Sequence, residues 1–317
     1  MSRFDIISIL GKGFFGKTYY AYDKILKINV ALKIIPLSDS NVSLQSIDEI
    51  EALKSLSKYP SCNKHIVCYY DGYLESDNNM NYLYIVTEYI DGITLDTFMK
   101  INQYIPDKYL LDIIYKLIEG LVTIHSKNYC HGDIKPENIM ITKNGDIKYI
   151  DFGLACTLDC DIECHDNCNR RTIEPVLYKS PEYYSLKYRN IDLAKSNDVW
   201  ALGVIIYQLL NNNNYPFDLS VDIQTLKNNI LTAPKYRSNR TDILDKFISD
   251  ILINDYKNRP DIKSIYSKFI TIINDYSSYD NKDDADLMFD EESSDVIQSS
   301  DSSQSYYEDI PIFKYYM

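Results

Sequence analysis

The stretch that decides the fold is His131-Gly132-Asp133-Ile134-Lys135-Pro136-Glu137-Asn138, followed a short distance later by Asp151-Phe152-Gly153. Between them, Asn144-Gly145 separates two strand-like runs, and an Asn-Gly pair in this setting is a strong β-hairpin signal. The predicted hairpin over residues 139–150 places Asn138 and Asp151 at its two ends, where both side chains can reach one divalent cation. Asp133 is set apart from that pair and is available to accept a proton.

This pattern resembles the catalytic loop and the metal-binding motif of the eukaryotic-type protein kinases, serine/threonine class. The resemblance implies an α+β, bilobal protein kinase fold with a small β-rich N-lobe and a larger helical C-lobe. It implies a kinase domain over residues 4–272, divided into an N-lobe (4–87), a hinge (88–92) and a C-lobe (93–272). Residues 273–317 then form a separate acidic tail.

A glycine-rich stretch opens the chain: Leu10-Gly11-Lys12-Gly13-Phe14-Phe15-Gly16-Lys17-Thr18. Glycines at this spacing also occur in ordinary hairpins, so the stretch alone is weak evidence. A dinucleotide-binding fold would continue into a helix at the third glycine, whereas residues 18–22 are strand-like. We therefore expect a hairpin whose glycines let the backbone approach nucleotide phosphates, with all nine residues at the ATP site.

Val30-Ala31-Leu32-Lys33 reads as a strand that ends in a lysine. By its position after the glycine-rich stretch, Lys33 resembles the kinase lysine that holds the α- and β-phosphates, and Ala31 falls at the adenine site. Residues 46–58 read as a helix with apolar residues at three-residue spacing. Alignment to that apolar stripe favours Glu49 as the carboxylate partner of Lys33, with Glu51 as the alternative.

Residues 83–92 read as a buried strand that runs into a turn and resemble the hinge between the two kinase lobes. The resemblance places Thr87 at the back of the adenine pocket and the backbone groups of Glu88 and Ile90 against the purine. Residues 106–126 form the clearest helix, because their apolar side chains make one continuous face. This helix leads directly into the catalytic loop.

Three later motifs complete the resemblance. Ser180-Pro181-Glu182 resembles the Ala-Pro-Glu end of the kinase activation segment. Asp198 matches the family aspartate that holds the catalytic-loop backbone, and Arg259 matches the arginine that pairs with Glu182. We expect that buried pair to be structural, so its loss should loosen the lobe without removing a reacting group.

The resemblance implies ATP- and Mg²⁺-dependent phosphoryl transfer to protein substrates. Asp133 orients the substrate hydroxyl and accepts its proton, and Lys135 touches the γ-phosphate. Asn138 and Asp151 bind Mg²⁺, which offsets charge on the phosphate oxygens. A lysine two residues after the aspartate is typical of serine/threonine kinases, so we expect serine and threonine to be the acceptors.

Two departures from the family pattern keep an alternative open. Gly132 replaces the arginine that pairs with a phosphorylated activation loop, which implies that this loop needs no phosphorylation. Pro175 replaces the usual threonine near the end of the segment. The alternative is an inactive kinase fold that binds partners through its activation segment and acidic tail. The intact Lys33 and Asp151 favour the enzyme, and Ser180-Pro181-Glu182 argues against a small-molecule kinase.

The net charge of −13 is concentrated at one end. Twelve acidic residues and two lysines from Asn274 onward give −10, which leaves −3 for the rest of the chain. Neither part is the basic patch expected of a nucleic-acid partner. The longest apolar run, 199–210, is too short for a membrane span and fits a buried helix. The start of the chain is unlike a secretory signal, which predicts an intracellular, cytoplasmic protein without structural disulfides; the oligomeric state stays open.

A ladder of cysteines follows the metal motif: Cys156, Cys160, Cys164 and Cys168. The spacing lies within the range used by zinc sites, and a Zn²⁺ ion would order the segment. A redox switch is a second interpretation, although the neighbouring acidic residues raise thiol pKa values. Reduced thiols in an irregular insertion are the third.

Residues 274–305 are rich in Asp and Ser and poor in large apolar residues, which predicts disorder. Serines beside the acids are candidates for phosphorylation. The apolar segment 310–317 either contacts the small lobe or a partner, or forms a sticky disordered end.

Overall fold

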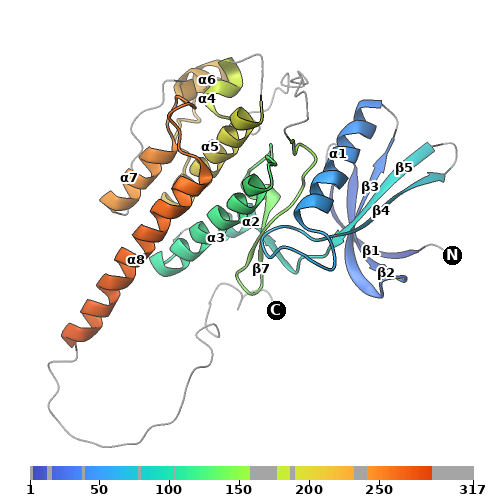
Figure 1. Ribbon diagram of the computed structural model, residues 1–317, viewed down its shortest axis with the longest axis horizontal. Coiled ribbons are helices and arrows are strands. Elements are labelled where there is room, and N and C mark those ends of the chain that lie inside the picture. The colour runs from blue at the N-terminus through green and yellow to red at the C-terminus, as the bar shows by residue number, and fades with distance from the viewer. Residues whose placement is uncertain are drawn as a thin grey trace, which may run out of the picture. The chain divides into compact units, whose positions relative to one another are not determined.

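The computed structural model describes residues 3–12, 16–37, 40–77, 80–102, 104–157, 177–185, 190–231 and 241–287. The chain separates into two units, Met1–Tyr266 and Ser267–Met317. The first unit contains a five-stranded sheet followed by a helical region (Figure 1). The predicted bilobal α+β architecture, with a β-rich N-lobe and a helical C-lobe, is confirmed.

The N-lobe is an antiparallel sheet in the order β1-β2-β3-β5-β4, with one helix, α1, beside it (Figure 1). Its elements are β1 (Phe4–Lys12), β2 (Lys17–Asp23), β3 (Ile28–Pro36), α1 (Ser40–Leu56), β4 (Tyr69–Asp77) and β5 (Met80–Glu88). The predicted hairpin around the glycine-rich stretch is present, because β1 and β2 pair from Phe4↔Asp23 to Lys12↔Lys17. The β3–β5 register sets Ala31 opposite Thr87, which brings the two predicted adenine-site residues together.

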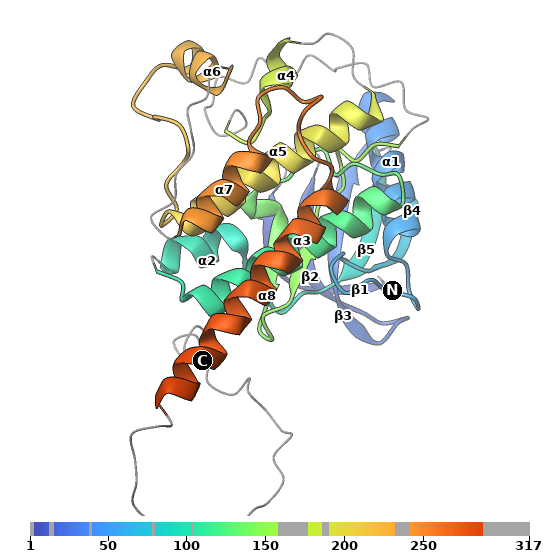
Figure 2. The same cartoon turned by 60° about the vertical axis from the view of Figure 1, so that its left-hand side comes forward.

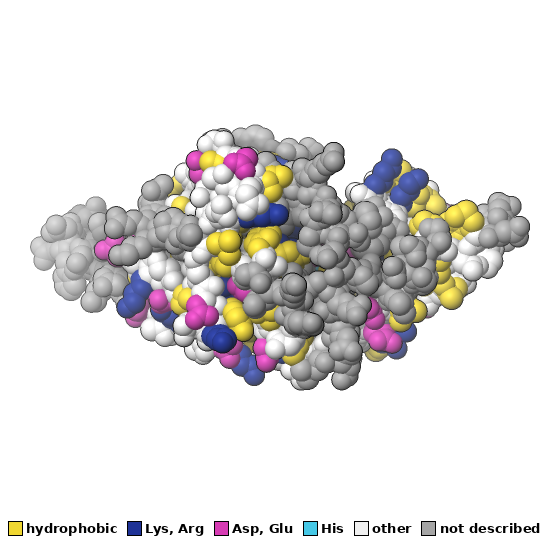
Figure 3. All heavy atoms as spheres, turned by 90° about the horizontal axis from the view of Figure 1, so that it is seen from above, with side chains coloured by type: hydrophobic (Ala, Val, Ile, Leu, Met, Phe, Trp, Pro, Cys, Tyr) yellow, Lys and Arg dark blue, Asp and Glu magenta, His cyan; other side chains and the backbone are white. Residues whose placement is uncertain are grey.

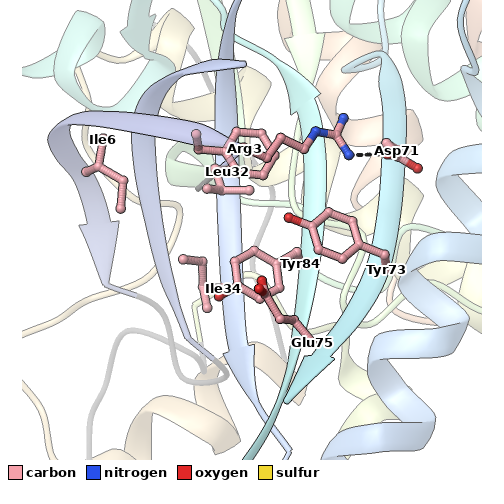
Figure 4. A pocket seen from close by; sticks show the side chains of 9 residues that line it. Arg3, Ile6, Leu32, Ile34, Asp71, Tyr73, Glu75 and Tyr84 are labelled. Atoms are coloured by element: carbon pink, nitrogen blue, oxygen red, sulfur yellow. Dashed lines mark hydrogen bonds and ion pairs between the residues drawn. The ribbon is translucent and has the colours of Figure 1, made fainter. Parts of the chain in front are cut away.

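The side chains of β3 alternate between the two faces of this sheet. Lys33 lies on the face toward α1, where it meets Glu49. Leu32 and Ile34 lie on the opposite face and line a pocket of about 590 Å³ together with Tyr73 and Tyr84, whose rings stack with centroids 5.0 Å apart (Figure 4). The pocket is therefore separated from the predicted ATP face by the sheet itself.

The N-lobe exposes many apolar side chains on its strands and strand connections. Yellow side chains are correspondingly common at the sheet end of the molecule in Figure 3. They include Ile6, Ile7, Ile9, Leu10, Ile25, Leu26, Ile28, Leu74 and Met80. Scattered exposed apolar residues are normal on protein surfaces, so this feature carries no functional assignment.

Helix α1 begins six residues earlier than the sequence predicts, at Ser40 instead of Ser46, and ends at Leu56. Three of these six residues, Ser40, Asn41 and Ser43, are Ser or Asn, and such residues favour caps and turns over helix interiors. Their weak propensity conceals the start of the helix, whereas the apolar stripe reveals its second half, where Leu53 and Leu56 are buried.

The C-lobe is built on two long helices, α3 (Asp107–Ser126) and α5 (Ile191–Leu210), which pack against each other (Figure 2). The predicted helix over 106–126 and the predicted buried helix over 199–210 are both present. The remaining elements are β6 (Gly92–Thr94), α2 (Leu95–Ile101), η1 (Pro136–Asn138), β7 (Ile139–Thr142), β8 (Ile147–Tyr149), α4 (Pro181–Ser185), α6 (Ile223–Leu231), α7 (Asp242–Ile251) and α8 (Ile262–Leu287). Among the helices that the structure describes, none is long and apolar enough to cross a membrane.

The expected disorder of the acidic tail is wrong for its first part, because α8 continues to Leu287. The helix starts on apolar residues at helical spacing, Ile262, Ile265, Phe269 and Ile272, all of which are buried. Extending an existing helix is much easier than nucleating one, so Asp- and Ser-rich turns can follow a nucleated segment. The tail from residue 288 onward lies outside the described residues.

The expected absence of disulfides is also wrong. The structure contains Cys62–Cys68 and Cys130–Cys156, whose Cα atoms lie 5.2 and 5.3 Å apart. Cys130 and Cys156 face each other across a small antiparallel bridge in which each backbone N–H donates to the other carbonyl, at 2.9 and 3.2 Å. Chain composition cannot reveal such pairing, because it depends on the fold bringing residues 26 positions apart into register.

The predicted pair between Glu182 and Arg259 is present and buried. Both terminal nitrogens of the guanidinium donate to the carboxylate, at 2.5 and 3.0 Å, and the guanidinium also lies over the Trp200 ring, 5.0 Å from its centroid. The pair joins the start of α4 to the segment before α8, so it fixes the end of the activation segment on the C-lobe core.

We expect Glu182→Ala to lower the free energy of unfolding by about 3–5 kcal/mol, because it leaves a buried guanidinium without its counter-charge. Urea denaturation, followed by the fluorescence of the single tryptophan, Trp200, measures the change. Asp96→Ala is the matched control, since it removes a 2.8 Å pair with the exposed Lys100 and should cost less than about 1 kcal/mol. A loss for Glu182→Ala no larger than that of the control would contradict the prediction.

Candidate active site

The catalytic hairpin is formed by β7 and β8, paired from Ile139↔Tyr149 to Ile141↔Ile147. Its turn closes where the Thr142 N–H donates to the Asp146 carbonyl (2.9 Å), and Gly145 takes the left-handed φ of +78° that the turn requires. At the open end, the Ile150 N–H donates to the Asn138 carbonyl (2.9 Å). The hairpin therefore keeps the chain at Asn138 next to the chain that leads into Asp151, as the sequence predicts.

Asp133 is surrounded by polar groups from its own loop. The Lys135 ammonium donates to Asp133 Oδ2 at 2.7 Å, and the Asn138 amide donates to the same oxygen and to the Asp133 carbonyl, both at 2.9 Å. Because the amide nitrogen of Asn138 is used in this way, its amide oxygen points elsewhere. Burial raises the pKa of Asp133, but the charges of Lys179 and Lys135 outweigh burial and hold that pKa below its ordinary value.

His131 connects the catalytic loop to the metal motif from a fully buried position. The Asp133 N–H donates to His131 Nδ1 (3.3 Å), so the remaining ring N–H, at Nε2, donates to the Ile150 carbonyl (3.0 Å). Burial lowers the pKa of His131, in keeping with this neutral form. The ring also packs on Phe152, with centroids 4.7 Å apart.

Asp198, at the centre of α5, holds the loop from behind. Its carboxylate accepts the backbone N–H of His131 (2.7 Å) and of Gly132 (3.0 Å), and it also contacts His125 Nε2 at 3.1 Å. The predicted contact between Asp198 and the catalytic-loop backbone is present. A buried carboxylate that accepts backbone N–H groups fixes the loop on the rigid helix.

The predicted pair between Lys33 and Glu49 is present, and Glu51 is exposed on another side of α1. The Lys33 ammonium donates to both carboxylate oxygens of Glu49, at 2.7 and 2.8 Å, and to Asp151 Oδ1 at 3.1 Å. Burial lowers the pKa of Lys33, but the charges of Glu49 and Asp151 outweigh burial and raise it, so the lysine stays charged. Lys33 thereby joins the sheet, α1 and the metal motif at one point.

The residues predicted at the adenine site lie where β3 pairs with β5. The Thr87 hydroxyl donates to the Ala31 carbonyl at 3.4 Å, and Ile90 is buried just beyond the end of β5. The Glu88 N–H donates to the Cys68 carbonyl (2.8 Å), so Glu88 can offer a ligand only its carbonyl. Its side chain is held by Lys148 at 2.9 Å.

The glycine-rich hairpin is described only in part. Leu10, Gly11 and Lys12 end β1, while Lys17 and Thr18 begin β2 in register with Lys12 and Gly11. A Cβ added at Gly16 would lie 2.2 Å from the Ile34 carbonyl oxygen, so glycine is required where β2 approaches β3. Gly13, Phe14 and Phe15 lie outside the described residues.

The four-cysteine zinc site is contradicted at its first member. Cys156 is bonded to Cys130, so its sulfur is not a thiolate and cannot serve as a zinc ligand. Among the residues that the structure describes, Cys, His, Asp and Glu side chains form no cluster of three that could hold a metal ion. Cys160, Cys164 and Cys168 lie outside the described residues, as does Pro175.

Sequence reasoning missed two features of the catalytic loop. Gly132 has a φ of +80°, and a Cβ there would lie 2.2 Å from the Leu154 carbonyl oxygen, so this glycine is a requirement of the loop and not only a missing arginine. The second is Lys179, whose ammonium donates to the Gly132 carbonyl at 2.9 Å. The signal that could have revealed the role of Gly132 is the glycine itself, at a position where the family pattern has arginine.

Comparison with known proteins agrees with this geometry. The family model described as "Protein kinase domain" matches residues 4–270. The chain is 32% identical over 219 residues to the serine/threonine-protein kinase PrkC of Bacillus subtilis, covering 68% of this chain and 31% of that protein. It is 29% identical over 224 residues to a probable serine/threonine-protein kinase of Dictyostelium discoideum, covering 66% of this chain and 47% of that protein.

A plant protein, MAP3K epsilon protein kinase 1 of Arabidopsis thaliana, is 27% identical over 266 residues, covering 81% of this chain and 18% of that protein. The matches therefore span less than half the length of each of these relatives. The family match extends over most of the chain and includes both the sheet and the catalytic hairpin. The chain thus belongs to the protein kinase family.

Proposed function

We propose that this chain is a protein serine/threonine kinase that transfers the γ-phosphate of ATP to hydroxyl groups of protein substrates. The observation that carries the proposal is the arrangement around Asp133, where Lys135 and Asn138 hold one carboxylate oxygen in a loop fixed from behind by Asp198. Phosphoryl transfer needs positioning and charge neutralisation more than covalent chemistry from the protein. The names of the relatives and the spacing of Asp133 and Lys135 support serine and threonine as acceptors.

The donor groups fit a magnesium ion. Asn138 commits its amide nitrogen to Asp133, which leaves the amide oxygen for a ligand. Asp151 commits one oxygen to Lys33, and its side chain is 48% exposed. Carboxylate and amide oxygens are ligands that Mg²⁺ prefers, and the bound ion would supply charge neutralisation at the phosphates.

The predicted site residues then bind the nucleotide, orient the substrate hydroxyl or offset charge on the phosphates. The Lys33 ammonium, fixed by Glu49, binds the α- and β-phosphates, while Ala31, Glu88 and Ile90 surround the purine. The glycine-rich hairpin covers the phosphates. Asp133 orients the substrate hydroxyl and accepts its proton as the oxygen–phosphorus bond forms and the β–γ bond breaks. Lys135 offsets charge on the transferred group.

We assign the kinase domain to residues 4–272, with an N-lobe (4–87), a hinge (88–92) and a C-lobe (93–272), and residues 273–317 to an appended acidic tail. The activity is placed in the cytoplasm, where ATP is available. Protein substrates are the proposed partners.

The test is transfer of labelled phosphate from Mg-ATP to a generic basic protein, followed by phosphoamino-acid analysis. We expect phosphoserine and phosphothreonine with the wild type, and a loss of about 10³-fold or more in rate with Asp133→Asn, which removes the charge that positions the hydroxyl. Absence of transfer by a wild-type protein that still binds the nucleotide would reject the enzyme and favour the partner-binding scaffold.

A further inference from the structure

The end of the activation segment is fixed on helix α5 on both sides of Lys179. The Ser180 N–H and hydroxyl both donate to the Asn197 side chain, at 3.1 and 3.0 Å. On the other side, the Tyr178 hydroxyl donates to Gln208 at 3.0 Å. Because the residues before and after it are fixed, the backbone of Lys179 has a defined position relative to the C-lobe core.

The side chain of Lys179 reaches from this position into the catalytic loop. Its ammonium donates to the Gly132 carbonyl at 2.9 Å and lies 3.9 Å from Asp133 Oδ1. The side chain is only 14% exposed, and its ammonium also lies over the Tyr183 ring, 5.2 Å from the centroid. A charge in this partly buried setting is screened less by solvent than a surface charge.

The contacts on the two oxygens of Asp133 come from different parts of the chain. Lys135 and Asn138 both donate to Oδ2, and both belong to the catalytic loop itself. Oδ1 instead faces Lys179, which belongs to the activation segment. Lys179 therefore brings a positive charge from the activation segment to the oxygen of Asp133 other than the one that Lys135 contacts.

The Gly132 backbone is also held by two different elements, α5 and the activation segment. Its N–H donates to Asp198 and its carbonyl accepts from Lys179, so the peptide groups before Asp133 are clamped between α5 and the activation segment. A side chain at position 132 is excluded by the approach to Leu154. A cation in this chain can therefore reach the loop from the activation segment but not from position 132.

We propose that Lys179 is a positioning residue for phosphoryl transfer, which couples the anchored end of the activation segment to Asp133 through Gly132 and needs no phosphate group to do so. The proposal rests on the proposed kinase function. In the family pattern, an arginine of the catalytic loop, at the position of Gly132, contacts the activation segment. In this chain the cation belongs to the activation segment and contacts the catalytic loop. Lys179 orients Asp133 and does not itself touch the reacting atoms.

The experiment uses the full chain with Mg-ATP and a serine-containing protein substrate, and compares four proteins. Lys179→Gln keeps a hydrogen-bond donor but removes the charge, and Lys179→Arg keeps both. Lys116→Met is the matched control, because Lys116 is 15% exposed, donates to the Gly145 carbonyl at 2.9 Å and pairs with Asp112, all away from Asp133. The wild type sets the reference.

We expect Lys179→Gln to lower kcat about 10- to 100-fold, as for a displaced catalytic group, with the KM for ATP changed by less than about threefold. A fall in kcat with an unchanged KM for ATP is the pattern of a misplaced catalytic group and not of weaker nucleotide binding. Lys179→Arg should restore most of kcat, and Lys116→Met should stay within about twofold of wild type.

The outcomes separate the two proposals. An inactive wild type rejects the kinase function, and this role of Lys179 with it. An active wild type, with a kcat of Lys179→Gln equal to that of Lys116→Met, overturns the role of Lys179 alone. Trp200 fluorescence monitors the folding of each variant. If Lys179→Gln is unfolded while Lys179→Arg is folded, a kcat of Lys179→Arg below a tenth of the wild-type value overturns the proposal and a higher kcat upholds it.

Discussion

Asp151→Asn is expected to lower the rate of phosphate transfer about 10³-fold. The substitution replaces a carboxylate by a neutral amide at the position proposed to bind Mg²⁺, and about 4 kcal/mol of lost charge stabilisation corresponds to that factor. It also removes one of the two carboxylates that contact Lys33, leaving only Glu49. Single-turnover transfer at saturating Mg-ATP measures the loss, and a Mg²⁺ titration should show a higher apparent requirement.

The fold should survive this change, which makes the result interpretable. Asp151 has a left-handed φ of +59°, and asparagine tolerates that conformation as well as aspartate does. Asp146→Asn is the matched control, since Asp146 is an exposed aspartate on the same hairpin, and it should stay within about twofold of wild type. A rate for Asp151→Asn above a tenth of the wild-type rate would argue against the proposed metal role.

Gly132→Arg restores the residue usual in the family, and it is expected to damage this protein instead of improving it. The left-handed φ of +80° disfavours any side chain, and the new Cβ would lie 2.2 Å from the Leu154 carbonyl oxygen, which belongs to backbone and cannot turn aside. We expect the free energy of unfolding to fall by about 3 kcal/mol or more, from backbone strain and overpacking together. Activity should fall as well, because the peptide groups that contact Asp198 and Lys179 would move.

Gly145→Arg separates the two causes. Gly145 has nearly the same φ, +78°, but a Cβ there meets no atom within 4 Å. Its substitution should therefore cost only the backbone strain, about 1–2 kcal/mol, and leave transfer largely intact. Urea denaturation and transfer assays on both variants provide the comparison. Equal losses of stability at the two positions, or faster transfer by Gly132→Arg, would show that the clash at Leu154 is not decisive.

The fold was predictable where the signal was local. The Asn-Gly turn and its flanking runs predict the hairpin that the structure contains, and the apolar stripe of α1 correctly selects Glu49 over Glu51 as the partner of Lys33. The pairing of Glu182 with Arg259 followed from motif order. These features depend on spacing or on a recognisable residue pattern, and both can be read along the chain.

The remainder depends on which distant residues meet. The contact between Lys179 and Gly132 joins residues 47 positions apart, and a lysine before a proline-containing motif is indistinguishable in sequence from a surface lysine. The bond between Cys130 and Cys156 required the small antiparallel bridge at those residues. Local propensity also misplaced two helix boundaries. The Ser- and Asn-containing start of α1 and the Asp-rich end of α8 both have sequences typical of irregular structure.

The anchoring of α1 has a mechanical consequence. Directly after α1, the Ser57 hydroxyl donates to the Ile66 carbonyl (3.2 Å), and the adjacent Val67 N–H donates to the Tyr149 carbonyl of the catalytic hairpin (3.0 Å). Glu49 lies seven residues before the helix end, a lever arm of about 10 Å at 1.5 Å per residue. A tilt of about 15° around this pivot would carry the carboxylate about 3 Å, enough to separate it from Lys33 while the pivot stays in place.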